Sequence, residues 1–194
     1  MNHISRLVGI AACAVVPAVS QAQTSTTRPV SFGVTAGASV PVGDFGDAAD
    51  LGFTVGAHVL LAPSKMPALA FRGDVTYDRW ALKGIGSALV DGNASTLGVM
   101  GNVIFRSSSA MAIKPYVIGG AGLLSSNSSG SVAGVNFSSD RTNNFGVQAG
   151  GGLEFQLSGF TTFIEAKFVN AFSKDSNDKR QNTNWIPITF GIRF

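Results

Sequence analysis

The sequence predicts an all-β fold, an eight-stranded antiparallel up-and-down transmembrane β-barrel. Three observations predict it. Apolar and polar residues alternate with a period of two over much of the chain, which is typical of strands with one apolar face. Charged residues are 13% of the sequence and glycines number 24, whereas soluble domains carry roughly 25% charged residues. Long and short connections also alternate along the chain, as they do in bacterial membrane barrels.

The first 22 residues have the features of an export signal. Arg6 precedes the apolar run "LVGIAACAVVPAV", and Ser20 and Ala22 supply the small residues of a cleavage site before Gln23. A signal peptide over 1–22 and a mature barrel domain over 23–194 are therefore expected. The only cysteine, Cys13, lies in this leader. A lipoprotein signal at "IAAC" is less favoured because the apolar run between Arg6 and Cys13 is short, so the mature chain is expected to have no disulfide.

Eight segments are expected to form strands. In seven of them, one parity is mostly apolar and the other is small or polar; the glycine-rich fifth segment cannot be assigned by parity. No segment after the leader predicts a helix. The strands are expected over 30–40, 51–61, 69–79, 95–106, 113–124, 143–157, 160–172 and 185–194.

The connections between these segments predict how the strands are arranged. The first, third, fifth and seventh links, 41–50, 81–94, 125–142 and 173–183, are long, whereas the others are centred on "PSKMP", "SSSAM" and "SG". Long external loops and short periplasmic turns are typical of outer-membrane barrels. An even number of strands then places both chain ends on the periplasmic side.

The last segment is expected to close the barrel by pairing with the first, because a free sheet edge in hydrocarbon would leave backbone groups unsatisfied. Its lipid-facing residues would be Ile186, Ile188, Phe190, Ile192 and Phe194, and Thr189, Gly191 and Arg193 would face inward.

Aromatic residues gather near the segment ends and predict two interfacial belts. Trp80 and Trp185 do not share the lipid-facing parity. They are interpreted as strand-end positions where the alternation relaxes, as it does at a bulge.

Several segments resemble the small bacterial outer-membrane β-barrel proteins of the OmpA/OmpX and porin-like eight-stranded type. The resemblance rests on "VSFGVTAGASVPVGDF", "KPYVIGGAGL", "FGVQAGGGLEF" and the terminal "ITFGIRF". It implies a location in the cell outer membrane. It also implies that the assembly machinery of that membrane reads Phe190, Ile192 and Phe194 as a C-terminal signal.

Eight charged residues, four of each sign, are expected to face the lumen. The interior of an eight-stranded barrel is just wide enough for side chains to fill it. A paired charge network that plugs the lumen is therefore favoured over an ion or proton path of the kind a small-solute porin would have. The residues are Arg72, Asp74, Asp78, Arg106, Glu154, Glu165, Lys167 and Arg193.

Catalysis and metal binding have little support in the sequence. A lipid A-modifying barrel enzyme would need a serine and a carboxylate near His58, the only histidine after the leader. A lone inward histidine is more often a hydrogen-bonded filler. No second histidine and no cysteine accompany it as metal ligands. No catalytic residue, metal site or cofactor is therefore expected.

The remaining expectations concern partners. The net charge of +3 is small, so no nucleic-acid partner is expected. Outer-membrane lipid, lipopolysaccharide and the assembly machinery are the expected partners of a monomer with a structural or surface-interaction role. A soluble lipocalin-like barrel is the competing class, and it predicts the opposite arrangement, with an apolar interior and a polar exterior.

Overall fold

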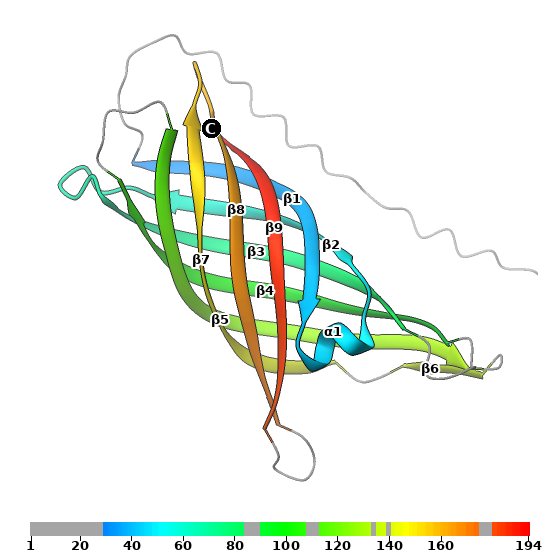
Figure 1. The fold of residues 1–194 in the computed structure, drawn as a ribbon. Helices are drawn as coiled ribbons and strands as arrows, with labels where there is room; N and C mark the ends of the chain where they lie inside the picture. The colour runs from blue at the N-terminus through cyan, green and yellow to red at the C-terminus, as the bar shows by residue number, and fades with distance from the viewer. Residues whose placement is uncertain (1–28, 84–89, 108–112, 133–134, 139–140, 175–179) are drawn as a thin grey trace, which may run out of the picture.

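The structure is a computed structural model that describes residues 29–83, 90–107, 113–132, 135–138, 141–174 and 180–194. Within these ranges the chain forms nine strands and one short helix, and the strands build a single barrel (Figure 1). The predicted signal peptide, 1–22, lies outside the described residues.

The strands begin and end close to the predicted segments, and several are longer than predicted. They are β1 (Val30–Val42), β2 (Gly52–Leu61), β3 (Leu69–Leu82), β4 (Val90–Arg106), β5 (Ile113–Val132), β6 (Val135–Ser138), β7 (Thr142–Gln156), β8 (Thr161–Lys174) and β9 (Arg180–Arg193), with α1 (Asp44–Ala48) between β1 and β2.

Eight of the strands close into an antiparallel barrel, so the predicted fold class is confirmed. The order of neighbours is β4, β3, β2, β1, β9, β8, β7, β5, and pairing between β4 and β5 completes the ring. Closure extends to the last residue, because Phe194 and Phe32 exchange two backbone hydrogen bonds of 2.9 and 3.1 Å. Every strand edge of the ring is thereby paired.

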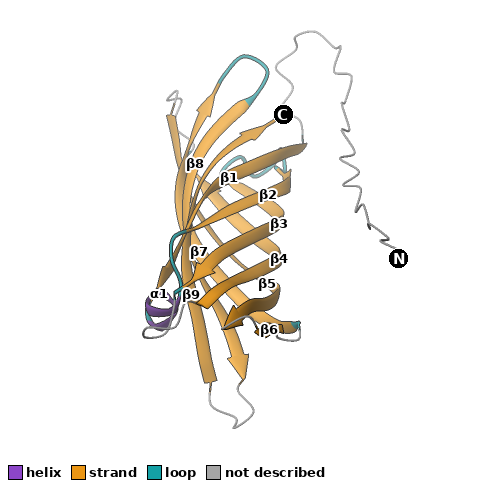
Figure 2. Ribbon diagram, turned by 90° about the vertical axis from the view of Figure 1, so that its right-hand side faces the viewer, coloured by secondary structure: helices purple, strands orange, loops and turns teal. Residues whose placement is uncertain are grey.

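The two ends of the barrel differ. We call the end that carries α1 and the β5–β6 hairpin the loop end, and the end that carries the β2–β3 and β7–β8 connections and Phe194 the turn end (Figure 2). At the turn end, Gly159 has a φ of 97°. Glycine adopts this conformation at little cost, which allows the tight β7–β8 turn.

The loop end corrects the predicted connections. The segment 125–142 was expected to be a loop, but β5 continues to Val132 and pairs along β4 as far as Val90. β6 then pairs with β5 as a hairpin outside the ring. The serines and glycines of this segment have no apolar alternation, yet backbone hydrogen bonds to β4 suffice to continue the sheet. The helix α1 was not predicted either.

The two faces of the sheet are inverted relative to a soluble barrel. Phe32 and Phe190 on the outer face are 59% and 51% exposed, whereas Arg72 and Glu154 inside are 3% and 2% exposed. The lipocalin-like alternative is therefore wrong. In the unassigned fifth strand, odd positions such as Val117 face outward and even positions face inward.

Trp80 and Trp185 also correct the prediction. Both are 2% exposed inside the barrel, and their rings meet edge to face at 5.4 Å between centroids. Their pairings, Trp80 with Ala94 and Trp185 with Val169, follow the regular register, so no bulge is present at either position. The alternation was intact, and these large side chains fill the interior.

Two apolar clusters occupy the lumen. The loop-end cluster consists of Ala49, Trp80, Ala94, Met100, Leu124, Val169, Ala171 and Trp185, with Phe45 of α1 packed on Trp80. The turn-end cluster consists of Leu60, Ala70, Ile104, Tyr116 and Ile118. Among the described helical residues, none belongs to a helix long and apolar enough to cross a membrane.

Candidate functional site in the barrel lumen

Polar side chains fill the lumen between the two apolar clusters. On β3, Arg72 and Asp74 follow Ala70 of the turn-end cluster and precede Trp80 of the loop-end cluster. The alternation of the strands places these charges inside, since each is separated from the next inward residue by one outward apolar or small residue. The structure places all eight predicted charges in the lumen, and seven of them are less than 9% exposed. The eighth, Arg106, has a side chain that is 15% exposed.

Four of these charges form what we call the central network, which consists of Arg72, Asp74, Glu165 and Lys167. The Arg72 guanidinium donates to both oxygens of Glu165 at 2.7 and 2.8 Å, and it contacts Asp74 at 2.8 and 3.0 Å. Lys167 Nζ lies 3.1 Å from Glu165 Oε1 and 3.5 Å from Asp74 Oδ2. The central network thus contains two cations and two carboxylates, and its formal charge is zero.

Neutral side chains complete the central network. The Tyr116 hydroxyl donates to Glu165 at 2.7 Å, and Asn102 donates to Asp74 at 3.1 Å. Gln148 in turn donates to Asn102 at 2.5 Å. Sequence reasoning did not assign these residues to the site. The alternation in β4 and β7 predicts that Asn102 and Gln148 face inward, so it could have identified them. Tyr116 lies on β5, the strand whose faces could not be assigned from the alternation.

The other predicted charges lie apart from the central network. Arg193 donates to Glu154 at 2.9 Å, and Arg106 Nε lies 3.6 Å from the same carboxylate, near the turn end. Asp78 lies toward the loop end and accepts a hydrogen bond of 3.0 Å from Ser39. Among the described residues, no cation lies within 4.0 Å of the Asp78 carboxylate.

His58, the histidine that the enzyme alternative would require, is 5% exposed inside the barrel. Its ring packs edge to face against Phe163, with 5.5 Å between centroids. Within the described part of the chain, its Nε2 has no hydrogen-bond partner. The same part of the chain contains no cluster of three or more His, Cys, Asp or Glu side chains suited to a metal ion.

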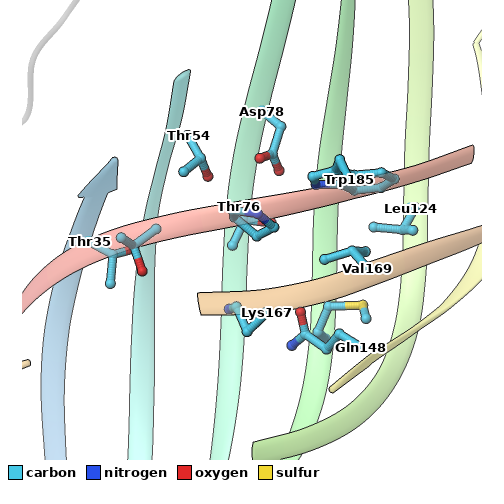
Figure 3. Close-up of a pocket in the computed structure, with 12 residues that line it drawn as sticks. Thr35, Thr54, Thr76, Asp78, Leu124, Gln148, Lys167, Val169 and Trp185 are labelled. Carbon is cyan, nitrogen blue, oxygen red and sulfur yellow. The ribbon is translucent and has the colours of Figure 1, made fainter. Parts of the chain in front are cut away.

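A small cavity lies beside Asp78 (Figure 3). Threonines from β1, β2, β3 and β9 line it together with Asp78, Gln148, Lys167 and Trp185. The space open to the centre of a water molecule is about 20 Å³. It is therefore far below the roughly 300–1,000 Å³ of the clefts that hold small organic ligands.

The residues of the predicted C-terminal signal lie on the outer face of β9. Phe190 and Phe194 are 51% and 53% exposed, and Ile192 is half-buried between them. Their pairing with β1 places them at the seam where the barrel closes.

Solved structures of small membrane barrels are similar to this fold. Neisserial surface protein A superposes with a TM-score of 0.55 at 16% identity, over 86% of this chain and 96% of that one. A major outer membrane protein of Thermus thermophilus superposes with a TM-score of 0.54 at 10% identity, over 86% of this chain and 99% of that one. For Ail, the attachment invasion locus protein of Yersinia pestis, the TM-score is 0.52 at 19% identity, over 85% of this chain and 97% of that one.

No protein-family model matches the sequence, and no curated protein sequence matches it. At identities of 10–19%, the structural likeness shows the fold alone. The fold is that of small eight-stranded outer-membrane barrels.

Proposed function

We propose that this chain is an outer-membrane barrel protein with a structural or surface-interaction role, whose lumen is plugged by its own side chains and which catalyses no reaction. The observation that carries the proposal is the inverted sheet. Phe32, Val99 and Phe190 are more than half exposed, while Arg72 and Glu165 are almost fully buried. Only a surrounding apolar phase accounts for this arrangement in a stable protein, because such an extensive apolar surface is unfavourable in water.

Aromatic side chains support the membrane position. Near the turn end, Phe71, Phe105 and Phe194 are between 44% and 58% exposed. Near the loop end, Phe53 pairs with Tyr77 and Phe145 stacks on Phe172, each pair with 6.3 Å between ring centroids. Two aromatic belts flanking an apolar band are typical of outer-membrane barrels. In the proposed orientation the turn end and both chain ends are periplasmic.

The packing of the lumen supports a barrel that does not conduct. The central network occupies the middle, and an apolar cluster lies on each side of it. Ions crossing the barrel would have to displace Trp80 and Trp185 as well as paired charges. The small-solute porin alternative is less favoured, because the cavity beside Asp78 has room for about one water molecule.

The loop end supplies the surface proposed for interaction. The β5–β6 hairpin continues the sheet beyond the ring, and α1 folds back on the barrel through Phe45 and Trp80. Of the similar proteins, one is named a surface protein and another an attachment invasion locus protein. Those names support a surface role here as a proposal. Arg79 and Lys83, both exposed near the loop end, are placed to meet lipopolysaccharide phosphates.

Fractionation and electrophoresis test the proposal. The barrel should appear in the outer membrane, and its migration in detergent gels should change on heating, because a closed barrel resists detergent until it is heated. Recovery as a soluble periplasmic protein would contradict the proposal. Planar bilayers test the plugged lumen, since a stable open conductance from the purified chain would contradict it.

The assembly signal needs its own experiment. Replacing Phe194 with serine should lower the fraction of chains that reach the folded, heat-modifiable form in cells. The matched control is Phe172→Ser, which changes the same residue type on the outer face of another strand. Equal assembly defects in the two variants would mean that Phe194 acts through its apolar surface and is not read as a signal.

A further inference from the structure

The cavity beside Asp78 brings together polar groups whose hydrogen-bonding capacity the protein itself uses only in part. Trp185 is 2% exposed and lines this cavity, and its indole Nε1 makes no hydrogen bond of regular geometry among the described residues, although it lies close enough to Asp78 to interact with its carboxylate. Figure 3 shows Asp78 and Trp185 among the side chains that line the cavity. A buried N–H group without a well-aligned partner is costly, so the site contains a donor that is only partly used.

Lys167 supplies a second unused donor. An ammonium group has three N–H donors. Contacts of Lys167 Nζ to Glu165 Oε1 and Asp74 Oδ2 account for two of them. Because Lys167 also lines the cavity and is 6% exposed, bulk solvent does not supply the third partner.

Asp78 supplies the acceptor. An ionised carboxylate accepts about four hydrogen bonds. The Ser39 hydroxyl donates to Oδ1 at 3.0 Å, and the Thr54 hydroxyl also interacts with the carboxylate. Asp78 is 3% exposed and lines the same cavity. A buried carboxylate without a cation beside it needs further donors to remain charged.

We infer that this cavity is an internal binding site for one water molecule, which accepts hydrogen bonds from Lys167 and Trp185 and donates one to Asp78. The size fits, because about 20 Å³ exceeds the roughly 10–15 Å³ that one water requires. A metal cation is disfavoured since two donors, one of them charged, face the site. An anion is disfavoured by the carboxylate. Water serves both kinds of partner at once.

The bound water extends the central network. It connects Asp78 and, through it, Ser39 of β1 to Lys167 of β8. Within the described part of the chain, the contacts between side chains in the central network join β3, β4, β5, β7 and β8. Met100, Leu124 and Val169 of the loop-end cluster also line the cavity, so apolar side chains cover the water on that side. This inference goes beyond the proposed function, since it holds whether or not the barrel conducts.

Nuclear magnetic resonance of the two tryptophan indoles tests the inference. The chain contains two tryptophans, so the full protein folded in detergent micelles gives two indole N–H signals. Trp80 is the internal control, because its Nε1 donates to the Ser39 carbonyl at 3.2 Å. The Trp185 signal should show a direct nuclear Overhauser effect to a long-lived water molecule, and the Trp80 signal should show a weaker one or none.

Two results would overturn the inference. One is a Trp185 indole with no water signal, which would indicate a direct bond to Asp78. The other is a Trp185 signal that arises from chemical exchange with bulk water, which rotating-frame spectra distinguish by sign. The wild-type chain decides between these outcomes. If Asp78→Leu folds, its Trp185 water signal should be lost while the Trp80 signal keeps its position.

Discussion

Replacing Glu165 with glutamine should destabilise the barrel strongly, because it removes one charge from the middle of the central network without changing the shape of the side chain. Arg72 and Lys167 lie 2.7 and 3.1 Å from the Glu165 carboxylate. At an effective dielectric constant of about 20, each contact corresponds to roughly 5–6 kcal/mol of Coulomb attraction. The variant also avoids the desolvation of a carboxylate, which offsets part of the loss.

The expected net cost is about 3–5 kcal/mol in the free energy of unfolding, the range found when one partner of a buried pair is removed. It arises because the central network then carries two cations and one carboxylate. Adding Lys167→Met restores its neutrality and leaves Arg72 paired with Asp74 at 2.8 Å. The double variant should therefore be more stable than the sum of the two single changes predicts, by about 2 kcal/mol or more.

Urea unfolding of the barrel in lipid vesicles measures these energies. Tryptophan fluorescence reports directly on the lumen, because Trp80 and Trp185 are both buried there. Asp50→Asn is the control for charge removal, since its contact with Lys83 is long, at 3.9 Å, and exposed. That variant should change stability by less than about 0.5 kcal/mol. A cost below about 1 kcal/mol for Glu165→Gln, or strict additivity in the double variant, would refute the reasoning.

Three further predictions follow from the packing and the outer face. Gly37→Ala should destabilise the barrel by about 1–3 kcal/mol in urea unfolding, because an added Cβ would lie 2.0 Å from the Ile188 carbonyl oxygen. The control is Gly73→Ala, whose Cβ would meet nothing within 4 Å and which should be neutral or stabilising. Equal costs for the two variants would contradict this explanation. Val99→Arg should lower the free energy of unfolding in lipid vesicles by about 2–4 kcal/mol. Val99 is 56% exposed and pairs with Val75, which lies on β3 between Phe71 and Tyr77. Val30→Arg, at the turn end, should lower it by less than about 1 kcal/mol, and the reverse order would argue against the membrane position. His58→Ala should leave the lipid A profile of the cells unchanged, because His58 packs against Phe163 as a filler; an altered profile in cells with normal barrel levels would support the enzyme alternative.

The sequence alone was sufficient to predict the barrel and its two faces. Alternation has a period of two in any strand, so the parity of Phe32, Arg72 and Glu154 predicts which side each faces once one side is known to be apolar. The unusually low charge content and the predicted export signal indicated lipid as the apolar phase. The same parity predicted that all eight lumen charges share one face, without reference to any contact between them.

The tertiary structure decided which of those charges meet. Parity places Asp78 and Asp74 on one face of β3. It does not say that Lys167 of β8 pairs with Asp74 and not with Asp78, because that depends on the stagger of strands far apart in the sequence. Closure of the barrel also buried Trp80 and Trp185, whose rings pack against each other inside it. In a barrel the apolar phase outside and the packed interior both attract large apolar side chains, so hydrophobicity alone cannot assign them, whereas the register of the closed sheet does.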